Sequence, residues 1–147
     1  MKKILSLLLV GLMIPFMMSC SSDDDENVDI NSYIVGNWHS YKATVYYEGK
    51  SASVDITKSG QYSDMYIEIS FNQDGTMVES AWQKNDSGLK NWVQENARYT
   101  IKDDIVSIKD SGGVVDLLFD SKTKELCLQS STTYVGSTMR TNIYFKK

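Results

Sequence analysis

The feature that most constrains the fold is a repeated rhythm of strand and turn that runs from Tyr33 to Lys147. Its clearest example is the segment 65–71, in which apolar residues alternate with Tyr66, Glu68 and Ser70. A period of two places successive side chains on opposite faces of a β-strand. Residues 72–75, Asn-Gln-Asp-Gly, then supply turn residues, and the glycine suits a positive φ. This stretch therefore predicts a β-hairpin.

The same rhythm predicts strands along the whole domain, and no segment shows the pattern of a capped amphipathic helix. Short strands joined by tight turns are typical of an antiparallel meander, which forms a barrel or a sandwich. We favour an all-β, up-and-down barrel of about eight or nine strands, because pairing the first strand with the last removes both exposed edges. A β-sandwich is the alternative. The expected strands are 38–47, 51–57, 65–71, 76–84, 92–102, 105–109, 114–119, 125–130 and 139–146.

The N-terminal segment is different in kind. Lys2 and Lys3 precede an apolar run of 15 residues, 4–18, which is shorter than the roughly 20 residues a spanning helix needs. A charged start, a short apolar stretch and a small residue before the cleavage point are typical of a secretory signal peptide. We therefore expect a signal peptide at 1–19, a linker at 20–31 and one domain at 32–147.

Residues 17–20, Met-Met-Ser-Cys, resemble the lipobox of bacterial lipoproteins. That resemblance implies that Cys20 carries acyl chains such as palmitate and holds the protein on the outer membrane. The acidic run that follows resembles the export signal of Bacteroidota surface lipoproteins, which implies display at the cell surface. The alternative is a solvated acidic linker. The expected export residues are Ser22, Asp23, Asp24, Asp25 and Glu26.

Composition narrows the function classes. From Ser32 onward the chain has 13 basic and 14 acidic residues, so it lacks the basic face that nucleic-acid binding requires. With Cys20 committed to lipid, Cys127 has no partner for an intramolecular disulfide. His39 is the single histidine, and no nucleophile, phosphate-loop or dinucleotide motif occurs. We therefore assign no catalytic residue, metal or cofactor, and we do not expect an enzyme.

The motif Gly36-Asn37-Trp38 resembles the Gly-x-Trp opening of lipocalin-like domains, and residues 71–76 are similar to the Phe-x-x-Asp-Gly-Thr hairpin of their bacterial members. The resemblance covers roughly residues 33–147. It implies a barrel in which Gly36 and Trp38 form the floor and Arg140 of the last strand stacks across the indole. The alternative for Arg140 is an ordinary outward-facing strand position.

The same resemblance implies non-enzymatic binding of a small apolar or amphipathic molecule by a monomer. Tyr41, Trp82 and Tyr99 are the expected ligand residues, because each has an apolar body and a hydrogen-bonding tip. Tyr41 is expected on the same strand face as Ala43. These aromatic residues suit core packing equally well. The rival functions are a protein-binding module of the hydrolase-inhibitor type and a carbohydrate-binding accessory lipoprotein. A cavity of roughly 300 Å³ or more beside the three aromatic residues would favour the ligand.

Overall fold

The computed structural model describes residues 28–110, 112–134 and 136–147. The expected signal peptide, Cys20 and the acidic run from Ser22 to Glu26 lie outside these residues. Among the described residues, no helix has both the length and the apolar character needed to cross a bilayer. The described elements are α1 (Ile30–Tyr33), β1 (Gly36–Tyr47), β2 (Lys50–Asp55), η2 (Ser63–Met65), β3 (Ile67–Phe71), β4 (Thr76–Lys84), β5 (Lys90–Lys102), β6 (Ile105–Asp110), β7 (Gly113–Asp120), β8 (Glu125–Tyr134) and β9 (Ser137–Lys146).

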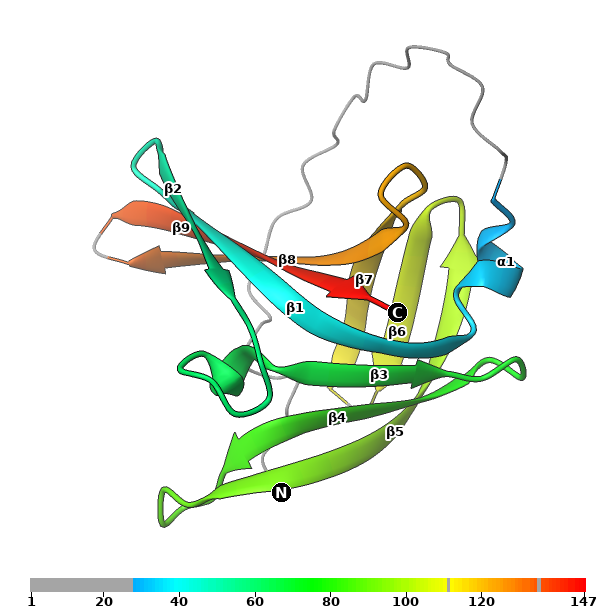
Figure 1. The fold of residues 1–147 in the computed structure, drawn as a ribbon, viewed down its shortest axis with the longest axis horizontal. Coiled ribbons are helices and arrows are strands. Elements are labelled where there is room, and N and C mark those ends of the chain that lie inside the picture. The colour runs from blue at the N-terminus through cyan, green and yellow to red at the C-terminus, as the bar shows by residue number, and fades with distance from the viewer. Residues whose placement is uncertain (1–27, 111, 135) are drawn as a thin grey trace.

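The strands form one antiparallel sheet that closes on itself (Figure 1). Each strand from β3 to β9 pairs with the next, and β9 pairs back onto β1. One edge of β1 is shared, because residues 36–39 pair with β3 whereas residues 42–47 pair with β2. The prediction of an up-and-down barrel is confirmed: eight strands close the barrel, and β2 is an additional strand beside β1.

A β-bulge in β1 decides which side chains face the interior. The pairing of β1 with β9 steps from Ser40 to Lys42, so that Tyr41 has no partner residue in β9. Trp38 and Ser40 are buried before the bulge, and Ala43 is buried after it. One inserted residue reverses the alternation of faces. The expectation that Tyr41 shares a face with Ala43 is therefore wrong.

Every barrel strand contributes buried side chains to one core. Burying one large apolar side chain contributes about 1.5–3 kcal/mol to the stability of the fold. The expected strand at 65–71 begins two residues late, because Met65 ends the short 3-10 helix η2 and still packs against the core. The largest fully buried apolar side chains are Trp38, Phe71, Phe145, Ile34, Met77, Leu117, Leu126 and Val106.

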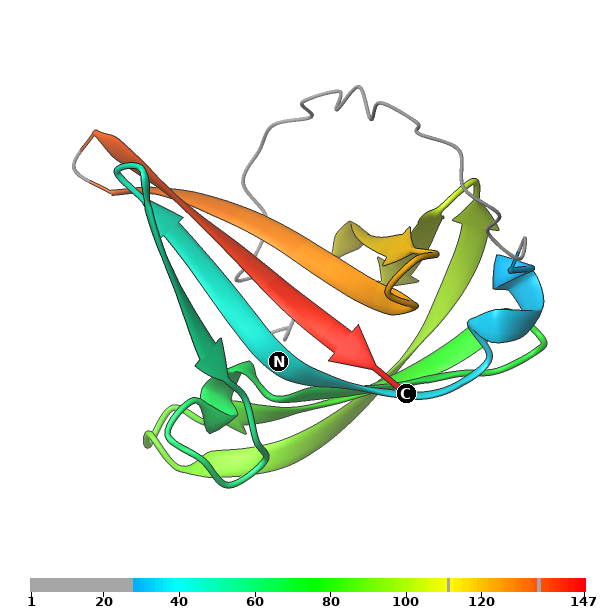
Figure 2. The same ribbon diagram turned by 45° about the horizontal axis from the view of Figure 1, so that its top comes forward.

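The two ends of the barrel differ. At one end α1 lies across the strand ends (Figure 2). The Asp29 carboxylate caps this helix by accepting a hydrogen bond from the Asn31 backbone N–H at 3.1 Å. At the other end the β4–β5 hairpin lies apart from the β1–β2 and β8–β9 hairpins, which stay together because β1 pairs with β9 as far as Tyr47 (Figures 1 and 2). Accordingly, β5 pairs with β6 only at residues 98–102, and β7 pairs with β8 only at residues 117–120. We call these the closed end and the open end.

Candidate ligand-binding site

The closed end is sealed by an aromatic group around Trp38, which is 1% exposed. Its indole N–H donates a hydrogen bond to the Ile34 carbonyl at 2.7 Å. The Tyr33 ring packs edge-on against it at 6.0 Å and also meets Phe119 at 5.6 Å. The Lys147 ammonium nitrogen lies 4.5 Å from the Tyr33 ring centroid and 5.7 Å from that of Trp38, and burial lowers its pKa. These contacts close this end of the barrel with packed rings, which we call the floor.

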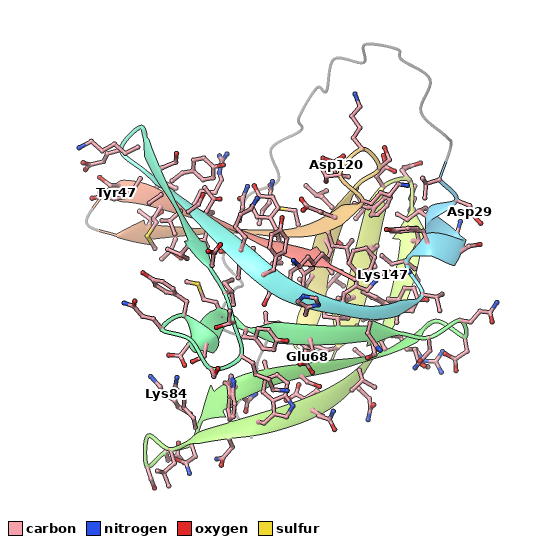
Figure 3. All side chains as sticks on the ribbon, viewed as in Figure 1. Asp29, Tyr47, Glu68, Lys84, Asp120 and Lys147 are labelled. Carbon is pink, nitrogen blue, oxygen red and sulfur yellow. The ribbon has the colours of Figure 1, made fainter. Side chains whose placement is uncertain are left out.

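Arg140 does not take part in this floor. In the register of β9 against β1 it lies opposite Tyr46, near the open end, and its side chain is exposed. The expectation that Arg140 stacks on Trp38 is therefore wrong, and the alternative of an outward-facing residue is correct. The physical reason is that β9 runs antiparallel to β1, so the early residues of β9 lie against the late residues of β1. The cation near Trp38 is instead Lys147, which Figure 3 labels just after the end of β9.

Gly36 opens β1 at the same end with a φ of 126°, a conformation that disfavours any side chain. It positions Trp38 two residues later, pointing into the barrel opposite Ile69 of β3. The first position of the Gly-x-Trp motif therefore requires glycine for its backbone conformation, and the third requires tryptophan for its packing in the barrel.

Tyr99 lies toward the closed end, beside the β3–β4 turn, and is 9% exposed. Its hydroxyl donates to the Asn72 carbonyl at 2.6 Å, and its ring packs edge-on against Phe71 with centroids 4.8 Å apart. Burial, followed by the nearby charge of Asp74, raises the pKa of Tyr99. The hydroxyl is thus already engaged by the backbone of the β3–β4 turn.

Trp82 and Tyr41 lie on the outer surface of the barrel. Trp82 pairs across strands with Trp92 at 5.2 Å between centroids, and its N–H donates to the Lys58 carbonyl at 3.1 Å. The Tyr41 hydroxyl donates to the Glu125 carboxylate. The structure therefore does not gather Tyr41, Trp82 and Tyr99 around one space, and a ligand-binding role for them stays a prediction.

A carboxyl group that sequence reasoning missed lies on the inner wall. Glu79 follows Met77 on the inward face of β4 and is 7% exposed. It lies between Ile69 of β3 and Glu95 of β5 in the register of the sheet. Burial first, and then the charges of Glu95 and Asp110, raise the pKa of Glu79 to about 7. The available signal was its place in the alternation Met77, Glu79, Ala81.

Two further features lie near this wall. Gln83, four residues beyond Glu79 on the same face, has a buried side-chain amide nitrogen without a hydrogen-bond partner. An open hollow of about 530 Å³ runs along β4 and β5 to the point where β5 and β6 separate. Neither the three predicted aromatic residues nor Glu79 and Gln83 line it. Its lining comprises Asn72, Thr76, Met77, Val78, Asn96, Ala97, Arg98, Lys109 and Asp110.

Residues with catalytic or metal-binding potential are scattered. No group of three or more His, Cys, Asp and Glu side chains in the described part of the chain is arranged to hold a metal ion. His39 is partly buried on β1, between Glu68 and Lys146 in the register. Cys127 is a free thiol whose pKa burial raises to about 11, so it is protonated at neutral pH.

Comparison with known proteins finds one matching family and several solved structures of low sequence identity. A family model described as a lipocalin-like domain matches residues 34–126. No curated protein matches the chain significantly. Lobster apocrustacyanin A1 is 18% identical with a TM-score of 0.39, over 80% of this chain and 61% of the crustacyanin chain. The siderocalin Ex-FABP is 12% identical with a TM-score of 0.40, over 78% of this chain and 73% of its own. This chain thus spans under two thirds of the crustacyanin.

Proposed function

The chain belongs to the lipocalin-like domain family, and we propose that it binds a small apolar or amphipathic molecule in its barrel as a lipid-anchored outer-membrane protein. Members of this family are generally binding proteins without enzymatic activity. The observation that carries the proposal is a closed eight-stranded barrel with one built floor and one divergent end. Small-molecule sites are largely apolar and supplied with a few polar groups, and the inner wall around Glu79 combines buried apolar side chains with one carboxyl group.

The anchor rests on the sequence alone. Cys20 follows a charged start, an apolar run and Ser19, and the acidic run begins three residues after it, at Asp23. One acyl chain binds a membrane marginally, whereas two or more hold a protein there stably, because each buried methylene adds about 0.8 kcal/mol. We expect Cys20→Ser to move the protein from the membrane fraction to the soluble fraction. Unchanged partitioning of that variant would overturn the anchor, and protease accessibility on intact cells tests surface display.

Native mass spectrometry of the protein, purified from the cells that make it, tests ligand binding. We expect a fraction of the protein to carry additional mass from a retained small molecule. Titration with lipids and haem, followed by tryptophan fluorescence, extends the test to ligands lost during purification. Bare protein alone, with no fluorescence change for any added compound, would contradict the proposal.

Exposed apolar side chains at the open end favour one second candidate, a protein-binding module. Tyr46 and Tyr47 of β1 and Met139 of β9 are exposed and lie side by side at the paired hairpin tips, and Leu89, at the separate tip of the β4–β5 hairpin, is 66% exposed. Apolar groups gathered at loop tips are typical of interaction surfaces. An inhibitor of this kind would lower the activity of lysozyme or a related hydrolase, and Leu89→Ser would weaken the inhibition. The carbohydrate alternative gains no such support, because Trp82 and Trp92 pack edge to face and not as a flat row.

A further inference from the structure

We propose that the barrel holds a cationic group of its ligand against Glu79, so that the ligand class is small amphipathic amines. This inference rests on the ligand-binding function proposed above and narrows it to one chemistry. It starts from the carboxyl group of Glu79, which is buried in the barrel and has no hydrogen-bond or ion-pair partner among the described residues.

The position of Glu79 is fixed by the sheet. Its neighbours along the inward face of β4 are Met77 and Ala81, which are both buried. Ile69 of β3 lies opposite on one side and Glu95 of β5 on the other. Directly paired residues of antiparallel strands have Cβ atoms about 4.5–5.5 Å apart. Two carboxyl groups therefore meet in an otherwise apolar part of the wall.

Nothing in the described part of the chain neutralises this pair of acids. Glu79 forms no side-chain hydrogen bond or ion pair there, and the charges that act on it are those of Glu95 and Asp110. The basic residues of β5, namely Lys90, Arg98 and Lys102, alternate with Glu95 and so lie on the outward face. Buried carboxylates are ordinarily paired, because an unpaired one loses its hydration without compensation.

The residues around Glu79 suit an organic amine better than a metal ion. No described group of three or more His, Cys, Asp and Glu side chains suits a metal. The apolar neighbours of Glu79 suit a hydrocarbon body instead. Gln83 adds an unpartnered amide nitrogen on the same face, about 13 Å from Glu79 for four residues of strand. A ligand with an ammonium group, an apolar body and a distant hydrogen-bond acceptor fits all three features.

A matched set of head groups tests the inference. The protein as its cells make it, held in lipid nanodiscs, is titrated calorimetrically at pH 8 with 4-phenylbutylamine, 4-phenylbutanol and 4-phenylbutyrate. Empty nanodiscs give the reference for partition into lipid. We expect the amine to bind at least about tenfold more tightly than the alcohol, because charge-assisted hydrogen bonds are the stronger ones. The carboxylate is expected to bind most weakly.

Two variants and one control locate the effect. Glu79→Gln keeps the size of the side chain and is expected to lower amine affinity about tenfold while leaving the alcohol unchanged. Glu68→Gln makes the same change on the outer face of β3, beside Lys58, and is expected to alter neither. Glu95→Gln is expected to weaken the amine severalfold, and it keeps the inference testable if Glu79→Gln does not fold.

The outcomes separate this inference from the function on which it rests. Binding of the alcohol or the carboxylate as tightly as the amine would overturn the amine assignment alone, as would an amine preference that survives both variants. Failure of all three probes and of native mass spectrometry would overturn ligand binding as well. An amine preference that Glu79→Gln abolishes and Glu68→Gln retains supports both.

Discussion

The closed and open ends of the barrel are built from the same strands yet satisfy their polar groups in opposite ways. At the closed end the Trp38 N–H is hydrogen-bonded and the Lys147 ammonium lies over the Tyr33 ring. Toward the open end, Glu79 and the amide nitrogen of Gln83 are buried without partners. The comparison shows that the polar groups of the closed end have partners within the protein. Those toward the open end lack partners that a bound ligand would supply.

The largest effect should come from removing the floor. We expect Trp38→Ala to lower the free energy of unfolding by about 3–5 kcal/mol, because it leaves a large cavity and removes the hydrogen bond to Ile34. Tyr47→Ala, at the other end of the same strand, should cost less than about 1 kcal/mol, since Tyr47 is 41% exposed and lies outside the buried core. Urea unfolding of both variants measures the difference. Equal losses would contradict the contrast between the ends.

The second effect concerns the interior carboxyl and depends on pH. The pKa of Glu79 is raised from 4.5 to about 7 in the folded protein, so its contribution to stability is full below pH 4.5 and is lost as pH rises through about 7. Between pH 5 and pH 8.5, wild type should lose about 2–3 kcal/mol relative to Glu79→Gln. Urea unfolding of the two proteins at each pH measures this, and a constant difference would show that Glu79 does not titrate this way. Glu95 and Asp110 are the other titratable groups that act on it.

Tyr99 tests a second polar contact toward the closed end, beside the β3–β4 turn. We expect Tyr99→Phe to cost about 1 kcal/mol, because the Asn72 carbonyl loses its hydroxyl donor while the packing against Phe71 remains. Thermal unfolding measures the loss. If Tyr99 instead serves the ligand alone, the stability of the free protein will be unchanged and only ligand affinity will fall.

The smallest effect compares two cations. Lys147→Ala should lower stability by about 0.5–1 kcal/mol through loss of its contact with the Tyr33 ring. Arg140→Ala should stay within about 0.5 kcal/mol of wild type, because Arg140 is exposed and far from Trp38. Chemical denaturation of both in one buffer ranks them. A larger loss of stability for Arg140→Ala than for Lys147→Ala would indicate that Arg140, and not Lys147, supports the floor.

Much of the fold could be predicted from local pattern. The strand Thr76–Lys84 was expected with its observed bounds, and the Asn72–Gly75 turn fell where the alternation breaks. Barrel closure followed from the cost of exposed edges. The candidate site was predicted less well. Of the expected ligand residues, Tyr99 does reach the interior, but Trp82 lies on the outer face. The sequence does not single out Glu79, because acidic residues in strands are ordinarily solvated.

The sequence by itself determined where the strands and turns lie, since a period of two and turn-forming residues are local properties. It also placed Gly36 and Trp38 at the start of the first strand. Only the tertiary structure decided which faces meet. The bulge at Tyr41, the pairing of Arg140 with Tyr46 and the burial of Glu79 beside Glu95 all depend on cross-strand register. Alternation divides each strand into two faces, but the partner strands determine which face is buried and what it contacts.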